Sequence, residues 1–153
     1  MGDLIKILIV DDLKSMREEF VSICRSFLPA ARIDEASDVM MALGFIQKEA
    51  PPYDVVFTDI NMPEINGLKL ILHLRKLAAY RDTPVIVIST VAAHSDVERA
   101  MQIGANGYLN RPLQKEDFEV ILLTYLRPIL LKRRSSTSLE TEKLMKSLRK
   151  IVK

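Results

Sequence analysis

Short apolar runs recur along this chain of 153 residues, and between them lie segments with the length and spacing of helices. Residues 7–10 and 85–88 are continuously apolar, a pattern typical of parallel strands that are covered on both faces. Five runs are therefore predicted to form strands, the second being the weakest: residues 5–10, 32–35, 53–58, 84–89 and 107–109.

Apolar residues at helical spacing follow each predicted strand. The five sets are Met16, Phe20, Ile23 and Phe27; Val39, Leu43 and Ile46; Leu68, Ile71, Leu72 and Leu77; Val97, Met101 and Ile103; and Phe118, Ile121, Leu122 and Tyr125. Helix caps are predicted at Ser37, at Asn66 and at a capping box in residues 95–98. Strict alternation implies right-handed crossovers, so the predicted fold is α/β, a doubly wound parallel sheet in a three-layer sandwich.

The charge distribution divides the chain into an acidic body and a basic tail. Residues 132–153 hold eight Lys/Arg and two Glu, which leaves 14 Lys/Arg against 18 Asp/Glu in residues 1–131. We therefore predict one domain over residues 1–131, followed by a basic linker and an amphipathic helix over residues 132–153. This tail is either a solvated helix or interdomain linker, or it binds an acidic partner, another copy of the chain or anionic lipid.

Composition excludes several classes of protein. No apolar run reaches the roughly 18 residues of a spanning helix, and no signal-peptide pattern is found at the N-terminus, so a soluble cytoplasmic protein is expected. Cys24 is the only cysteine, so the chain can form neither an internal disulfide nor a thiolate metal cluster. No DNA-binding motif follows the predicted domain, and specific DNA binding is not expected.

Polar residues gather where the predicted strands end. Asp11 and Asp12 follow the first strand, Asp59 follows the third, and the pairs Ser89-Thr90 and Arg111-Pro112 lie at the ends of the fourth and fifth. Because the carboxyl ends of parallel strands meet at one edge of a sheet, these groups are expected to converge there. Three neighbouring carboxylates repel one another unless a cation neutralises them, and oxygen ligands favour Mg²⁺. Helix or turn capping explains each Asp singly but not their joint placement.

These motifs together resemble the receiver domains of two-component response regulators, and most of all the single-domain, chemotaxis-regulator-like receivers. The resemblance covers about residues 4–131 and rests on four segments: ILIVDD at residues 7–12, FTDINMP at residues 57–63, VIST at residues 87–90 and GANGYLNRPL at residues 104–113. It implies a flavodoxin-like sheet with strand order 2-1-3-4-5.

The resemblance also implies roles for individual residues. Asp59 would be the phosphoacceptor and the catalytic carboxylate. Asp11, Asp12, Asp59 and the main-chain carbonyl of Asn61 would bind Mg²⁺. The residues that contact the phosphoryl group or switch in response to it would be Ser89, Thr90, Tyr108 and Arg111.

Four positions have features of their own. Arg111 stands where the family has lysine, and its bulkier planar guanidinium would either contact the phosphoryl group or turn into solvent. Val91 replaces a residue that is often polar and influences phosphoryl lifetime in the family. Tyr108 has the family's aromatic switch position, although a lone Tyr on a strand is more often a packing residue. Pro112 suggests a cis peptide bond.

The expected function is Mg²⁺-dependent transfer of a phosphoryl group to Asp59 from a sensor histidine kinase or a phosphotransfer protein. The domain would catalyse its own phosphorylation and dephosphorylation without being a conventional enzyme, and its output would pass to a downstream protein partner. Whether it forms a homodimer is open. The principal alternative is a receiver-shaped interaction module that works without phosphorylation.

Two other classes fit the sequence less well. A haloacid-dehalogenase-like phosphatase carries its Asp-x-Asp signature after the first strand, whereas here Asp59 and Asn61 follow the third. A flavodoxin-like electron carrier needs a hydroxyl-rich phosphate loop after the first strand, where Asp11 and Asp12 would repel the phosphate.

Overall fold

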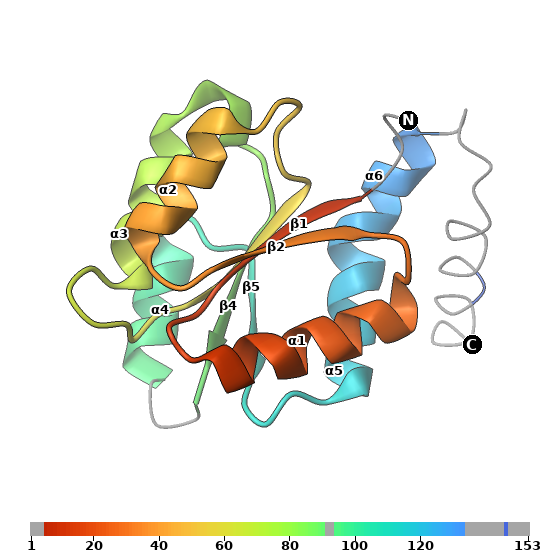
Figure 1. Cartoon of the computed structure of the whole chain (residues 1–153), viewed down its shortest axis with the longest axis horizontal. Helices are drawn as coiled ribbons and strands as arrows, with labels where there is room; N and C mark the ends of the chain where they lie inside the picture. Colours follow the sequence, from red (N-terminus) through yellow and green to blue (C-terminus); the bar gives the residue numbers. More distant parts are fainter. Residues whose placement is uncertain (1–4, 91–93, 134–145, 147–153) are drawn as a thin grey trace.

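The computed structural model describes residues 5–90, 94–133 and 146, and it contains a five-stranded parallel sheet (Figure 1). The strands are β1 (Lys6–Val10), β2 (Arg32–Ala36), β3 (Val55–Asp59), β4 (Val85–Ser89) and β5 (Gly107–Asn110). Their order is β2-β1-β3-β4-β5. The predicted strands, their parallel pairing and the 2-1-3-4-5 order are all confirmed.

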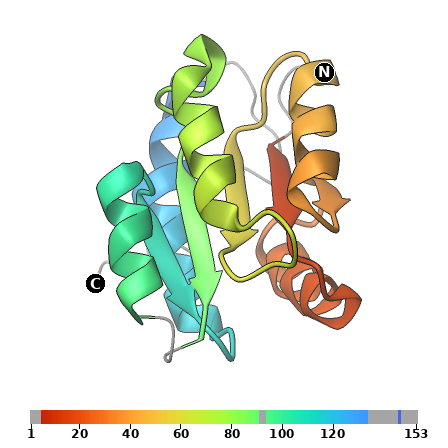
Figure 2. The ribbon, with the colours of Figure 1, turned by 90° about the vertical axis from the view of Figure 1, so that its left-hand side faces the viewer.

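Helices cover both faces of the sheet (Figures 1 and 2). The helical segments are α1 (Lys14–Phe27), α2 (Val39–Lys48), α3 (Gly67–Lys76), the short 3₁₀ turn η1 (Ala78–Tyr80), α4 (His94–Ile103), α5 (Lys115–Ile121), the π-helical segment η3 (Leu122–Leu126) and α6 (Arg127–Lys132). One face carries α1, α5 and α6, and the other carries α2, α3 and α4. None of the described helices combines the length and the apolar character needed to cross a membrane.

Each face of the sheet has its own hydrophobic core, which explains the continuously apolar strands. Ile7 and Ile9 of β1 belong to the core under α1 and α5, whereas Leu8 and Val10 belong to the core on the opposite face. In the first core, Phe20 of α1 packs against Phe57 of β3 with ring centroids 4.7 Å apart. These two cores hold the strand ends, and therefore the residues that follow them, in fixed positions.

Two of the three predicted helix caps were wrong. Asn66 caps α3 as predicted, and its side-chain oxygen accepts a hydrogen bond from the amide of Leu68 at 3.1 Å. For α2, however, Asp38 replaces Ser37 as the cap, since its extended backbone lets the carboxylate accept from Met41 N at 2.7 Å. Helix α4 begins at His94, so Ser95 lies inside its first turn and does not cap it.

The helix predicted after the fifth strand is not a uniform α-helix. Between α5 and α6 the backbone widens into η3, just before Pro128 near the start of α6. Proline has no N–H to donate, and its ring collides with the carbonyl four residues earlier, so an unbroken α-helix is disfavoured here. Leu122, Leu126 and Leu130 nevertheless stay buried at four-residue spacing, which keeps this segment packed on the sheet.

The described chain remains attached to the body up to Arg133, which pairs with Asp54 before β3. The linker and amphipathic helix predicted for the tail fall, except for residues 132, 133 and 146, outside the described residues and stay a prediction. Val91 also lies outside the described residues.

Candidate functional site

Three carboxylates converge at the carboxyl edge of the sheet, as the sequence predicts. In β1 and β3, Val10 lies beside Thr58, so the next residues along the two strands, Asp11 and Asp59, become neighbours. One oxygen atom from each of Asp11, Asp12 and Asp59 lies within 4.8 Å of the others. In the described part of the chain no other group of three acidic, His or Cys side chains is arranged in this way.

Asp11 is the most buried member of the carboxylate cluster, with 1% of its side chain exposed. Its Oδ1 accepts a hydrogen bond from the amide of Leu13 at 3.0 Å, and its Oδ2 forms an ion pair with the Arg111 guanidinium. Its backbone carbonyl accepts a hydrogen bond from Arg17 Nη1 at 2.7 Å. Arg17 was not identified from the sequence, because the apolar spacing of α1 does not show that a neighbouring arginine turns back to the strand end.

Asp59 has a perturbed ionisation. Burial and the negative charge of Asp11 raise the pKa of Asp59 to about 6, although the Arg111 charge and backbone N–H groups oppose the rise. One of these donors is the amide of Asn61, which lies 3.3 Å from Asp59 Oδ1. A cation placed among the carboxylates would reverse this rise, so the chemistry of the cluster fits a bound divalent metal.

The turn after β3 holds Asp59 against the start of α3. The amide of Gly67 donates to the carbonyl of Ile60 at 2.9 Å, and a Cβ atom at Gly67 would lie 2.2 Å from the Asp59 carbonyl oxygen. That distance is too short for any side chain, so glycine is required for this close approach. The sequence offers only a glycine after the Asn66 cap as a signal, and its role was not predicted.

Arg111 lies at the end of β5, where its amide donates to the Ser89 carbonyl at 2.9 Å. Its guanidinium points into the carboxylate cluster and not into solvent, and 13% of the side chain is exposed. The peptide bond between Arg111 and Pro112 is cis, as predicted. The site therefore combines three carboxylates with the positively charged guanidinium of Arg111, which is bonded to one of them.

Of the predicted switch residues, Ser89 ends β4 and Tyr108 lies on β5, while Thr90 and Arg111 directly follow these two strands. Ser89 is buried, and its hydroxyl donates to the carbonyl of Thr90 at 3.2 Å. Tyr108 is 49% exposed, so it is not the packing residue that a lone strand Tyr usually is. Together with Asp117 and Val120 of α5 it lines a groove of about 240 Å³.

Comparison with known proteins agrees with this arrangement. The model of the response regulator receiver domain matches residues 7–123. Chemotaxis protein CheY-3 of Vibrio cholerae serotype O1 is 36% identical over 107 residues, which cover 70% of this chain and 80% of that protein. Chemotaxis protein CheY1 of Helicobacter pylori is 33% identical over 123 residues, which cover 78% of this chain and 98% of that protein.

Solved structures have the same fold. CheY4 of Vibrio cholerae superposes with a TM-score of 0.70 at 26% identity, covering 80% of this chain and 98% of that one. The receiver domain of sensor histidine kinase PA1611 from Pseudomonas aeruginosa, solved with a magnesium ion in its active-site cleft, gives a TM-score of 0.70 at 24% identity, with 80% and 98% coverage. The chain therefore belongs to the response regulator receiver domain family of two-component signalling.

Proposed function

We propose that this receiver accepts a phosphoryl group on Asp59 from a phosphohistidine of a sensor kinase or phosphotransfer protein, in a Mg²⁺-dependent reaction. The observation that carries the proposal is the convergence of three carboxylates and the Arg111 guanidinium at the carboxyl edge of the sheet. A partly buried cluster of like charges is costly to maintain, and a phosphoacceptor site with its cation accounts for it.

Asp11, Asp12, Asp59 and the main-chain carbonyl of Asn61 would hold the Mg²⁺ ion. Hard oxygen donors suit this ion, which would neutralise the charges of the carboxylates and of the incoming phosphoryl group. The magnesium ion in the PA1611 receiver supports the assignment by analogy of fold.

In the proposed reaction, a carboxylate oxygen of Asp59 forms a bond to phosphorus as the bond from phosphorus to the donor histidine nitrogen breaks. The leaving imidazole then keeps the electron pair of that bond and takes up a proton. Asp59 must be ionised to attack, so the charges that lower its pKa also prepare it for the reaction. Positioning and charge neutralisation supply most of the catalysis in such transfers, which is why the domain can promote its own phosphorylation without being a conventional enzyme.

Arg111 would change partners during the reaction. In this structure its guanidinium binds Asp11, and on phosphorylation it would turn to the phosphoryl oxygens, where its planar fork can donate two hydrogen bonds. Ser89 and Thr90, at the end of the neighbouring strand, would contact the same group. Because the Arg111 amide is bonded to the Ser89 carbonyl, movements at the two residues are expected to be linked.

The output face would be the groove beside Tyr108. The exposed ring of Tyr108, with Val120 and Asp117, offers an apolar and polar surface that a downstream protein can bind. Inward movement of Tyr108 would alter that surface and so report the state of Asp59. We propose a cytoplasmic location for this function, in line with its membership of the receiver domain family.

The test is incubation of the chain with acetyl phosphate, with and without Mg²⁺, followed by intact-mass measurement. The proposal predicts the gain of one acid-labile phosphoryl group, only in the presence of Mg²⁺, and no gain in Asp59→Asn. Asp12→Ala should need more Mg²⁺ for the same gain, because one oxygen ligand is lost. An unchanged wild-type mass at saturating donor would favour the alternative, an interaction module that works without phosphorylation.

A further inference from the structure

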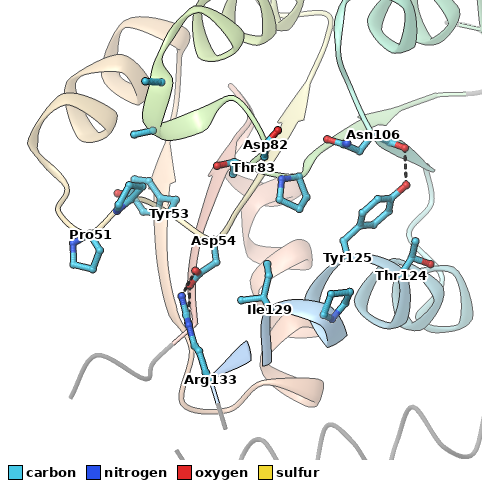
Figure 3. A pocket seen from close by; sticks show the side chains of 15 residues that line it. Pro51, Tyr53, Asp54, Asp82, Thr83, Asn106, Thr124, Tyr125, Ile129 and Arg133 are labelled. Atoms are coloured by element: carbon cyan, nitrogen blue, oxygen red, sulfur yellow. Dashed lines mark hydrogen bonds and ion pairs between the residues drawn. The ribbon is translucent and has the colours of Figure 1, made fainter. Parts of the chain in front are cut away.

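A second pocket opens at the amino edge of the sheet, away from the carboxylate cluster (Figure 3). Its volume is about 550 Å³, within the range of about 300–1,000 Å³ that is usual for binding pockets. Its walls are the residues that precede β3, β4 and β5, together with η1 and the segment from Thr124 to Arg133. Nothing in the proposed phosphoacceptor chemistry uses this pocket.

The lining combines apolar and acidic groups. Pro84, Pro128 and Ile129 contribute apolar surface, and the side chains of Asp54 and Asp82 add two carboxylates. Asp54 is paired with Arg133, whereas Asp82 is exposed and forms no direct ion pair among the described residues, although its charge interacts with that of Arg75. The pocket therefore suits a ligand that carries positive charge and apolar side chains together.

The described body of the chain ends at this pocket. Arg133, which follows α6, lines the pocket and donates to Asp54 Oδ2 from Nη1 at 3.2 Å. Residues 134–153 follow Arg133 directly in the sequence. They contain six Lys/Arg and two Glu, with Leu144, Leu148 and Ile151 among their apolar residues. Twenty residues can span up to about 70 Å when extended, far more than is needed to fold back over the pocket.

We propose that this pocket is the docking site for the basic tail, residues 134–153, of the same chain. Lysine or arginine side chains of the tail pair with Asp82, and its apolar side chains cover Pro128 and Ile129. Because the tail is tethered at Arg133, its contact with the pocket is intramolecular. The effective concentration of the tail at the pocket is then about millimolar, as is usual for short flexible linkers. The carboxylate cluster stays open, so this docking does not depend on phosphorylation.

Paramagnetic NMR on the full chain tests the proposal. A nitroxide label is attached to the cysteine of Ser147→Cys. The native Cys24 is buried and out of reach of the label, so the unsubstituted chain treated in the same way serves as the blank. We expect loss of amide signal intensity at Thr83, Asn106 and Thr124, and no loss at Asn61 on the opposite edge. The intensities should recover when the salt concentration rises from about 0.1 M to about 1 M, because the Debye screening length then falls from roughly 10 Å to roughly 3 Å.

A matched pair of charge reversals gives the control. Asp82→Lys should restore the intensities, while Glu116→Lys, the same change at an exposed site in the first turn of α5, should leave the loss unaltered. Mixing labelled chains with isotope-enriched unlabelled chains separates contacts within one chain from contacts between copies. Equal signal loss in that mixture, signal loss confined to another face, or no loss at these three amides would overturn the proposal.

Discussion

Arg111 is bonded to one of the two Asp11 oxygens that a cation in the carboxylate cluster could bind. The guanidinium contacts Asp11 Oδ2, while Oδ1 accepts a hydrogen bond from the amide of Leu13. A metal ion that binds Oδ2 must displace Arg111 or share the oxygen with it, and a metal ion on Oδ1 still meets the repulsion of the nearby guanidinium charge. The residue that departs from the family's lysine thus opposes the metal before phosphorylation and, in our proposal, supports the phosphoryl group afterwards.

Arg111→Ala is expected to raise the Mg²⁺ affinity on the order of tenfold, since a charge-assisted hydrogen bond contributes about 1.5–3 kcal/mol and 1.4 kcal/mol is tenfold. The same variant should weaken the response of the Tyr108 amide signal to beryllofluoride, because the charge of this phosphoryl mimic is then left uncompensated. Arg111→Lys should keep or improve that response. Calorimetric titration measures the Mg²⁺ affinity, and NMR measures the response to beryllofluoride. Identical responses of the wild type, Arg111→Ala and Arg111→Lys would show that Arg111 has no role in the site.

Asp59 carries a cost to stability that depends on pH. Its folded-state pKa of about 6 lies above the ordinary value of 3.8, so the folded protein binds this proton more tightly than the unfolded chain. Stability is therefore lost as pH rises from 3.8, and the loss is complete above about 6.

In metal-free buffer at about pH 8, Asp59→Asn should be the more stable protein by roughly 1 kcal/mol, after allowance for solvent screening of this partly exposed group. At about pH 3 the advantage should nearly disappear, because Asp59 is then largely protonated in both the folded and unfolded wild type. Urea unfolding at the two pH values measures the difference. Equal advantages at both would show that the charge of Asp59 is not the cause.

At the scale of elements, the junction of β3 and α3 has the tightest steric requirement among the glycines of the described chain. Gly67→Ala would drive a Cβ atom into the Asp59 carbonyl, whereas Gly44→Ala in α2 meets no atom within 4 Å. The first change should cost about 1–3 kcal/mol and slow phosphorylation of Asp59. The second should stabilise the protein by roughly 0.5–1 kcal/mol, as expected for glycine in a helix. Chemical denaturation measures the free energy of unfolding of both variants. Equal losses of stability in the two would contradict the steric role of Gly67.

Strand positions were predictable because both faces of the sheet are buried, which leaves uninterrupted apolar runs such as residues 85–88. The carboxylate cluster was predictable for a related reason, since a parallel sheet brings the ends of its strands to one edge. Local hydrogen bonds were harder to predict. Ser37 and Asp38 are equally good caps in sequence, and only the backbone angles choose between them. Likewise, apolar spacing does not show the widened turn before Pro128, which follows from the missing N–H and the bulk of the proline ring.

The hydrogen-bond and ion-pair partners of the side chains in the site also could not be predicted from the sequence. The placement of Arg111 at the strand edge was predicted, but not its bond to Asp11, because the two residues are 100 positions apart and a long side chain has many rotamers. The contact of Arg17 with the Asp11 carbonyl was missed for the same reason.

At the scale of the whole molecule, the sheet separates two regions with different chemistry. The carboxylate cluster lies at the carboxyl edge, and the tail-docking pocket lies at the amino edge beside Arg133. Two hydrophobic cores join these edges into one body, so an acceptor site and a tail-docking site can coexist without sharing a residue.

The central claim is that Asp59, and no neighbouring carboxylate, takes the phosphoryl group. Borohydride converts an aspartyl phosphate to homoserine, so its use after acetyl phosphate and Mg²⁺ marks the acceptor permanently, and peptide mass spectrometry then locates it. We predict homoserine at position 59, with Asp11 and Asp12 intact and no conversion when Mg²⁺ is omitted. Conversion at Asp11 or Asp12, or none at any of the three, would contradict the account.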